Sequence, residues 1–347
     1  MIDGGLTAAQ RAALEHIRGR AQVERDGARA ALIEGDAIAL VDQLREFARI
    51  HVHFHPDRRL ADGRRVADGL LADGRYRSQF ETGLSNGSRT AFPGGERDRW
   101  EEALFGGAYH RGAYDPGERP RYGGLDLLAF ADGACPRFGS CYLVLRREVL
   151  ARTTFCLGDS NHGPRWVGTI DAIEPVLAAR IASLGPSATA AMRAALVGAR
   201  TPGRGAVGRA LDDYVEAQVH GDLELRCDVE AMVVDPSLLA SETGATLTTI
   251  AERFGIPLAV HPGFAVAPAA IPDAFRSPAI PALATRLVAE LGGPGIDRVD
   301  AAMLGRGAAA IAEAPERWPE FADADAALQA VKQLWHALVA FGDPPAR

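Results

Sequence analysis

Hydrophobic periodicity changes along this chain from helical spacing to strand spacing and back, and this pattern limits the folds that the chain can adopt. Residues 6–49 place apolar side chains at helical spacing in LTAAQRAALEHIRGRA and AIALVDQLREFARI, which predicts at least two amphipathic helices. From His51 to Phe155 the apolar runs are short, as in HVHFH and SCYLVLR, and clusters of Gly and Pro divide them. Such runs are typical of β-strands joined by long loops. The sequence therefore predicts a fold of the α+β class.

Helices are expected again after this β-rich region. Helical spacing returns from Thr169 to Tyr214, and two strand-like runs, YVEAQVHG and LELRCDVEAMVVD, follow it. Gly221-Asp222 stands between these runs as a candidate hairpin turn. We predict three regions: a helical N-terminal region (1–49), a β-rich core (50–240) with a helical insertion at about 170–213, and a mostly helical C-terminal region (241–347).

Charge and composition narrow the class of protein. The 347 residues are 47% hydrophobic, which is enough to bury a large core. The 38 basic and 45 acidic residues give a net charge of -7, so no global positive field attracts nucleic acid. The first residues lack the basic and apolar regions of a secretory signal, and no stretch is apolar enough to cross a membrane. We therefore expect a cytoplasmic protein without nucleic-acid or membrane partners.

The densest polar segment is GRYRSQFETGLSNGS, from Gly74 to Ser88. Its backbone N–H groups and its arginines can bind a phosphate, although an ordinary polar β-turn has the same composition. In RPRYGGLD, the aromatic Tyr122 stands beside two glycines, where it can stack on a nicotinamide or adenine ring. Phe138 and Tyr142 have a similar setting, and for them packing in a β-core is an equal alternative.

Carboxylates gather on the two strand-like runs near residues 214–235. Glu216 lies on the first run, and Asp228 and Glu230 lie on the second, where alternation would place both on one face. Burial of a charged carboxylate is unfavourable, so the position of a carboxylate at the entry to a buried strand calls for an explanation. These three residues are therefore candidates for catalysis.

Three alternating histidines, His51, His53 and His55, form the run HVHFH, and on a strand their rings would face one way. Such runs occur in metal-dependent hydrolases, for which later ligands would be available in His162, His220 and His261. The chain lacks the repeated strand-helix units of such barrels. A strand whose histidines make hydrogen bonds without a metal is the other interpretation.

Several of these motifs together resemble one bacterial family, DUF3626. They are HFHPDR, YRSQFETGLSNG, GGERDRWEEALFGGAY, RPRYGGLD, PRFGSCYLVL, RTTFCLGDS and VEAQVHGDL, which span residues 50–240. That family is similar to bacterial effectors that ADP-ribosylate a threonine of ubiquitin, and DVEAMVVDPS resembles the catalytic strand of poly-ADP-ribose-polymerase-like enzymes. The resemblance implies an ADP-ribosyltransferase-like split β-sandwich core that uses NAD as a substrate and needs no metal. It also implies a protein acceptor such as ubiquitin, and delivery into another cell.

The resemblance also implies roles for individual residues. Glu230 would favour the positive charge that develops on the ribose, and Asp228 would take a proton from the acceptor hydroxyl. Glu216 is the rival for the glutamate role, because VEAQVHG is the more distinctive string. Arg77 would contact the NAD phosphates, and Tyr122 would stack on a ring. The other implied cofactor-binding residues are His55, Ser78, Thr82, Ser85, Asn86 and Gly87. A binding module without catalytic activity remains an alternative, since a fold alone does not establish chemistry.

Overall fold

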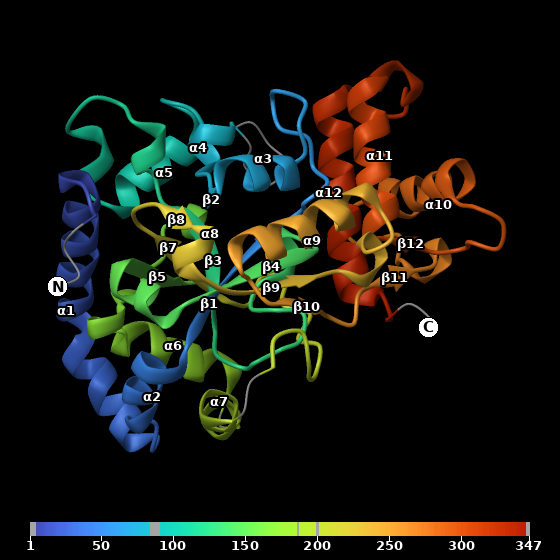
Figure 1. Cartoon of the computed structure of the whole chain (residues 1–347). Coiled ribbons are helices and arrows are strands. Elements are labelled where there is room, and N and C mark those ends of the chain that lie inside the picture. The colour runs from blue at the N-terminus through green and yellow to red at the C-terminus, as the bar shows by residue number, and fades with distance from the viewer. Residues whose placement is uncertain (1–4, 84–90, 186, 199–200, 345–347) are drawn as a thin grey trace.

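A large mixed sheet forms the centre of the molecule (Figure 1). The structure is a computed structural model that describes residues 5–83, 91–185, 187–198 and 201–344. The strand order in the sheet is β10-β9-β4-β1-β3-β7-β5-β6. These strands are β1 (Arg49–Phe54), β3 (Arg121–Asp126), β4 (Cys141–Leu145), β5 (Thr153–Leu157), β6 (Val167–Thr169), β7 (Val215–Val219), β9 (Val229–Val234) and β10 (Leu258–Val260). Two small sheets pair β2 (Arg75–Tyr76) with β8 (Leu223–Glu224), and β11 (Ala265–Val266) with β12 (Val299–Asp300).

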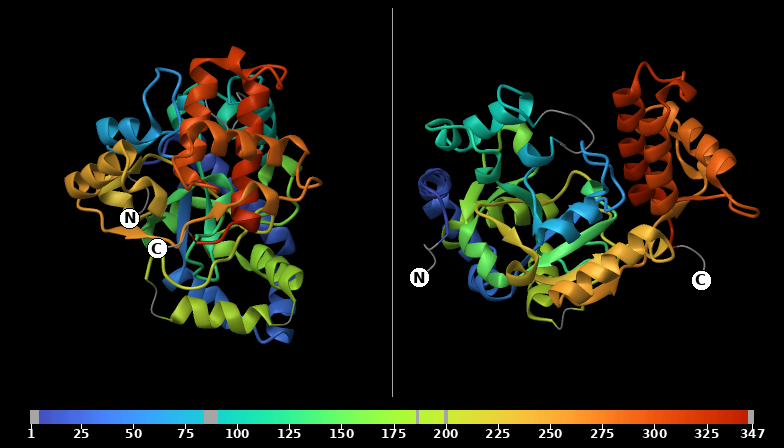
Figure 2. Two further views of the ribbon diagram at one scale, coloured as in Figure 1. Left: turned by 90° about the vertical axis from the view of Figure 1, so that its right-hand side faces the viewer. Right: turned by 45° about the horizontal axis from the view of Figure 1, so that its top comes forward.

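Helices surround this sheet in three groups, visible in Figures 1 and 2. The first group packs along one side and below the sheet in Figure 1 and comprises α1 (Ala8–Glu34), α2 (Ala39–Phe47), α6 (Glu174–Leu184) and α7 (Ala188–Val197). The second comprises α3 (Val66–Asp73), α4 (Gln79–Thr82), α5 (Glu96–Leu104), α8 (Leu225–Asp228) and α9 (Glu242–Phe254). The third comprises α10 (Ala279–Leu291), α11 (Ala301–Glu313) and α12 (Ala324–Phe341), which share a hydrophobic cluster of their own. Helices and one large sheet are thus mixed in a way that agrees with the α+β class.

The two faces of the sheet have different chemistry, because side chains alternate along each strand. One face is apolar: Ile50 and Val52 of β1, Leu143 of β4 and Ala217 of β7 belong to the main core. The opposite face carries buried polar groups. Its side chains include His51, His53, Tyr142, Glu216 and Gln218. This polar face is where a site can be built.

The sheet parts between β1 and β3. These strands pair only from Arg49↔Asp126 to His51↔Gly124. Beyond His51, β1 continues with β4 as its partner, whereas the start of β3 pairs with β7. The two halves of the sheet therefore separate at this point, and space opens on the polar face between them.

The prediction of a hairpin turn at Gly221-Asp222 is wrong. Strand β7 pairs with β3 and β5, whereas β9 pairs with β4 and β10 in the other half of the sheet. The residues between them form β8, which pairs with β2, and the short helix α8. A Gly-Asp pair between apolar runs favours a turn, but the pairing partners of the flanking strands are decided by distant segments.

None of the helices in the described part of the chain combines the length and the apolar character that a bilayer span needs.

Candidate functional site

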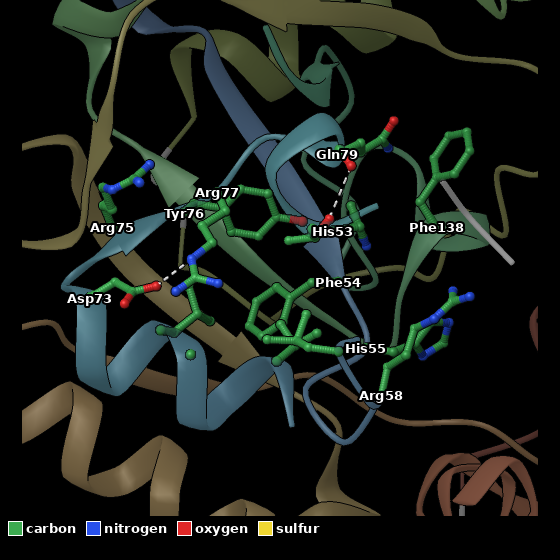
Figure 3. Close-up of a pocket in the computed structure, with 15 residues that line it drawn as sticks. His53, Phe54, His55, Arg58, Asp73, Arg75, Tyr76, Arg77, Gln79 and Phe138 are labelled. Atoms are coloured by element: carbon green, nitrogen blue, oxygen red, sulfur yellow. Dashed lines mark hydrogen bonds and ion pairs between the residues drawn. The ribbon is translucent and has the colours of Figure 1, made fainter. Parts of the chain in front are cut away.

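Three adjoining cavities lie beside β1 and the loop that follows it, and Phe138 lines all of them. We name them by their contents. The glutamate cavity is lined by Glu216, Tyr122, Arg97, Trp100, Asp159 and Asn161, among others. The arginine cavity, drawn in Figure 3, is lined by Arg58, Arg75, Arg77, Tyr76 and His53. The helix cavity lies between the loop after β1 and helices α11 and α12.

Glu216 lies at the centre of the glutamate cavity. It stands in the middle of β7, on the polar face, with Gly124 opposite it on β3 and Cys156 opposite it on β5. Gly124 has no side chain, and the side chains of Ala134 and Cys135 occupy the space beside it. Only 5% of Glu216 is exposed. The carboxyl group is thus held on a rigid strand and faces a cavity rather than bulk solvent.

Hydrogen bonds fix the orientation of this carboxyl group. The amide of Gln218 donates to its Oε1 at 2.8 Å, and the N–H of Ser160 lies 3.5 Å from its Oε2. The Thr154 hydroxyl donates to the side-chain amide oxygen (Oε1) of Gln218 at 2.8 Å, which turns the NH₂ group of the same amide toward Glu216. Gly158, with a φ of 77°, makes the turn that brings Ser160 and Asp159 back from the end of β5.

The ionisation of Glu216 is shifted. Burial is the main cause, and the nearby charge of Asp159 adds to it, so that the pKa of Glu216 rises from 4.5 to about 7. The hydrogen bonds from Ser160 and Gln218 and the charge of Arg97 act in the opposite direction. A carboxyl group with this pKa can exchange its proton near neutral pH, which is typical of catalytic acids and bases.

A network of buried charges holds the aromatic wall of the glutamate cavity. The Tyr122 hydroxyl donates to Oε1 of Glu101 at 2.7 Å, and Arg119 donates to Oε2 of the same residue at 3.0 Å. The guanidinium of Arg97 lies 4.5 Å from the centre of the Tyr122 ring and 4.7 Å from that of Trp100. The Tyr122 ring is therefore fixed in place before any ligand arrives, which lowers the entropic cost of stacking.

The arginine cavity contains arginines in two different environments. Arg77 forms an ion pair with Asp73 at 2.6 Å, as Figure 3 shows. Arg58 lies on the other side of the cavity, near His55 and Phe138 (Figure 3), and has no ion-pair or side-chain hydrogen-bond partner among the described residues. Burial lowers the pKa of Arg58, and the charge of Asp57 opposes this effect. A half-buried cation that forms no ion pair with the described residues is suited to binding an anion.

The structure brings some of the expected site residues together. Glu216, Arg77 and Tyr122 all line the glutamate cavity, and Arg77 also lines the arginine cavity. Thr82 and His55 line the arginine and helix cavities. Ser78 caps α4 instead: its hydroxyl accepts from the Glu81 N–H at 3.1 Å and donates to the Pro116 carbonyl at 2.6 Å. Ser85, Asn86 and Gly87 lie outside the described residues.

Glu230 and Asp228 lie away from the three cavities. The expectation that they share one face of a strand is wrong, because Asp228 ends helix α8 and β9 begins after it. Glu230 is the extra residue where the register between β4 and β9 shifts, and such a bulge turns its side chain out of the regular alternation. It is 41% exposed on its side chain and pairs with Arg49. Asp228 pairs with Arg152 at 2.9 Å and accepts from the Glu224 N–H.

The histidine run is only partly in one strand. His51 and His53 lie on β1, and both rings lie close to the Tyr142 ring, at centroid distances of 4.7 and 4.9 Å. His55 lies beyond the end of β1 and packs edge-on against Trp335. Both nitrogens of His53 face the backbone, Nδ1 at 3.2 Å from the Gly139 carbonyl and Nε2 at 3.4 Å from the Cys135 N–H. A metal at His53 would have to displace one of these contacts.

Other residues at the site were not expected from the sequence. Asp159 lies in a Gly-Asp-Ser string that directly follows a strand, which is a common place for site residues, but the same string is also typical of an ordinary turn. Arg58 stands in the string HPDR, which does not by itself indicate an anion site. Arg97, Trp100 and Lys332 lie on helices, and no local pattern distinguishes them from surface residues.

We predict a pH signature for Glu216 in the stability of the protein. Because its folded pKa of about 7 lies above its ordinary value of 4.5, the folded state holds this proton more tightly than the unfolded state. Stability is therefore lost as the pH rises between these two values and is constant above about pH 7. From about pH 5 to about pH 8 the wild type should lose about 3 kcal/mol of unfolding free energy relative to Glu216→Gln. Urea unfolding of both proteins across this range measures the difference, and parallel pH profiles would contradict it.

The family model DUF3626, described as a protein of unknown function, matches residues 49–341. This range includes the large sheet, all the residues named above at the three cavities, and the C-terminal helices α10, α11 and α12. No curated protein matches the chain.

Proposed function

The chain belongs to the DUF3626 family, and from its site we propose that it is a mono-ADP-ribosyltransferase. In this proposal the protein cleaves NAD and transfers ADP-ribose to a protein acceptor. The observation that carries the proposal is the position of Glu216: a buried carboxyl group on a central strand, facing a cavity that also contains a fixed tyrosine ring and several arginines.

The chemistry of NAD cleavage suits this arrangement. The bond between C1′ of the ribose and the nicotinamide nitrogen breaks, and its electron pair leaves with nicotinamide. Positive charge develops on the ribose, and an ionised Glu216 that accepts hydrogen bonds from the ribose hydroxyls would stabilise it. The Tyr122 ring and the Trp100 ring offer apolar faces for the nicotinamide.

A second carboxylate is needed to complete the transfer. The oxygen of an acceptor hydroxyl forms the new bond to C1′, and its proton must go to a base. Asp159 lines the same cavity as Glu216, whereas Asp228 lies elsewhere in an ion pair. In this proposal Asp159 therefore takes the role of the base.

The architecture gives further support. ADP-ribosyltransferases have a core in which the sheet is split and NAD lies in the cleft, as the resemblance of the motifs implies. Here the parting of β1 from β3 places Tyr122 and Glu216 in one half of the sheet and His53 in the other, around one cavity. Arg58 in the neighbouring cavity suits the diphosphate of the same ligand, whereas Arg77 is already paired with Asp73.

The test is the transfer of label from NAD. Purified full-length protein is incubated with NAD that carries a label on its adenosine, together with ubiquitin or with a cell lysate. The proposal expects release of nicotinamide and a labelled protein band. Labelled ubiquitin would identify that acceptor, and label on other proteins only would exclude it. Absence of both nicotinamide release and labelled protein, under all these conditions, would contradict the proposal.

We predict that Tyr122 contributes mainly through its ring. Tyr122→Ala removes the stacking surface and should raise the KM for NAD by about 5-fold, since an aromatic contact of this kind contributes about 1 kcal/mol beyond simple burial. Tyr122→Phe keeps the ring and should change the KM much less. Steady-state nicotinamide release measures both constants. Equal effects of the two substitutions would show that the hydroxyl, through Glu101, matters more than the ring.

A further inference from the structure

The helix cavity is large enough to hold part of a ligand, and the proposed chemistry does not yet use it. Its volume is about 520 Å³, within the range of about 300–1,000 Å³ that is typical of small-molecule sites. The loop after β1 forms one wall, and α11 and α12 form the other; Figure 2 shows these helices standing beside that loop. The cavity shares Arg137, Phe138 and Lys332 with the glutamate cavity.

Three cations meet at the junction of the cavities. Arg58 lines the arginine and helix cavities, whereas Arg137 and Lys332 line the helix and glutamate cavities. Neither Arg58 nor Lys332 has an ion-pair or side-chain hydrogen-bond partner within the described ranges. Arg137 pairs with Asp212, yet its buried Nε has no acceptor among the described residues. Burial and the neighbouring arginines lower the pKa of Lys332 to about 8.

Such a junction is suited to a multiply charged anion. All three cations are half-buried, and the charges of Arg58 and Arg137 disfavour the charged form of Lys332, so an anion that lies between them would reduce this repulsion. Arginine binds phosphate oxygens with two parallel hydrogen bonds, and lysine adds a point charge. A diphosphate matches this set of donors.

The helix cavity beyond the junction is lined by apolar side chains and by two carboxylates. The apolar side chains are small or aliphatic, namely Leu304, Ala308, Ala309, Ala312, Leu328 and Val331. The carboxylates are Asp57, from the loop after β1, and Asp325, on α12. Asp57 packs so closely on α11 that a Cβ at Gly305 would lie 1.7 Å from its Oδ2. Small residues leave room for a flat ring, and carboxylates accept hydrogen bonds from ribose hydroxyls or an amino group.

We propose that the C-terminal helices α11 and α12 complete the dinucleotide site and that the helix cavity binds the adenosine end of NAD. The order of the three features along the site is the order of the ligand itself. Nicotinamide and its ribose lie at Glu216, the diphosphate lies at Arg58, Arg137 and Lys332, and adenosine lies between the loop and the helices. This inference rests on the proposed function, because it identifies the ligand as NAD.

Binding of ADP and of nicotinamide mononucleotide to the full-length protein, measured by calorimetry, tests the inference without requiring turnover. Ala309→Trp fills the helix cavity and should weaken ADP binding by at least about 10-fold while leaving nicotinamide mononucleotide unaffected. Lys332→Met should weaken both ligands, because each carries a phosphate. Ala191→Trp, an exposed position on α7, is the matched control and should change neither affinity.

The outcomes separate this inference from the transferase proposal. If nicotinamide is released from NAD but Ala309→Trp changes neither ADP binding nor the KM for NAD, the adenosine lies elsewhere and the inference is overturned. It is also overturned if Ala309→Trp lowers transfer to a protein acceptor at an unchanged KM, because the cavity would then hold the acceptor. If Ala309→Trp and Lys332→Met both abolish ADP binding but NAD is never cleaved, the inference stands and the transferase proposal fails.

Discussion

Glu216→Gln should lower the rate of NAD cleavage by about 10²–10³-fold, which is the usual effect of removing one group that stabilises charge in the transition state. Glutamine keeps the size of the side chain and an oxygen for the hydrogen bond from Gln218, so the cavity should be preserved. It cannot carry the negative charge that favours a positive ribose. The KM for NAD should change little, because the charge acts mainly in the transition state.

Glu230→Gln is the matched control for this experiment. It makes the same chemical change in the same large sheet, but at a bulge in β9 where the carboxylate pairs with Arg49. Its rate should stay within about 2-fold of the wild type, since exposed ion pairs contribute little. A large loss of rate in Glu230→Gln, with a normal rate in Glu216→Gln, would reverse the assignment of the catalytic glutamate.

Arg119→Met should lower the free energy of unfolding by about 3–5 kcal/mol, the usual cost of removing one partner from a buried ion pair. Arg119 is 2% exposed and donates to Glu101, which has no exposed surface, and to Asp98. Without Arg119, the Glu101 carboxylate stays buried with Tyr122 and the more distant Arg97 as its remaining partners. Because Glu101 also fixes Tyr122, the KM for NAD should rise in the same variant.

Urea unfolding at pH 8 measures this effect, with Arg64→Met as the control. Arg64 pairs with Asp62 on the surface, with 40% of its side chain exposed, so its loss should change the free energy of unfolding much less than the loss of Arg119. A cost below about 1 kcal/mol for Arg119→Met would mean that Glu101 becomes protonated or hydrated at little expense. The wall of the glutamate cavity would then be less rigid than proposed.

Local patterns predicted the elements of this fold better than their pairing. The helices over residues 8–34 and 39–47 and the strands β1 and β7 follow from apolar spacing in single segments. The pairing of β7 with β3 and β5 does not, because it depends on contacts between residues more than 50 positions apart. For the same reason a Gly-Asp pair between two strands was mistaken for a hairpin.

The residues of the site also divide into those that a local pattern predicts and those that depend on contacts between distant segments. Tyr122 and Arg77 could be proposed from their local setting, an aromatic ring beside glycines and an arginine in a polar loop. The choice between Glu216 and Glu230 could not be made from the sequence, because both lie in strand-like patterns. Only the bulge in β9 separates their environments. Lys332 lies more than 100 residues from Glu216 in the sequence and reaches the same cavity only through the packing of α12.

The most direct test of the central claim is nicotinamide release from NAD, followed from about pH 5 to about pH 9 for the wild type and Glu216→Gln. The account predicts release by the wild type, with kcat/KM rising to a plateau through a pKa of about 7 for the free enzyme. Glu216→Gln should show only residual release with no such rise. Equal release by the two proteins, or none by the wild type with any acceptor present, would contradict the assignment of Glu216 as the catalytic carboxylate of an NAD-cleaving site.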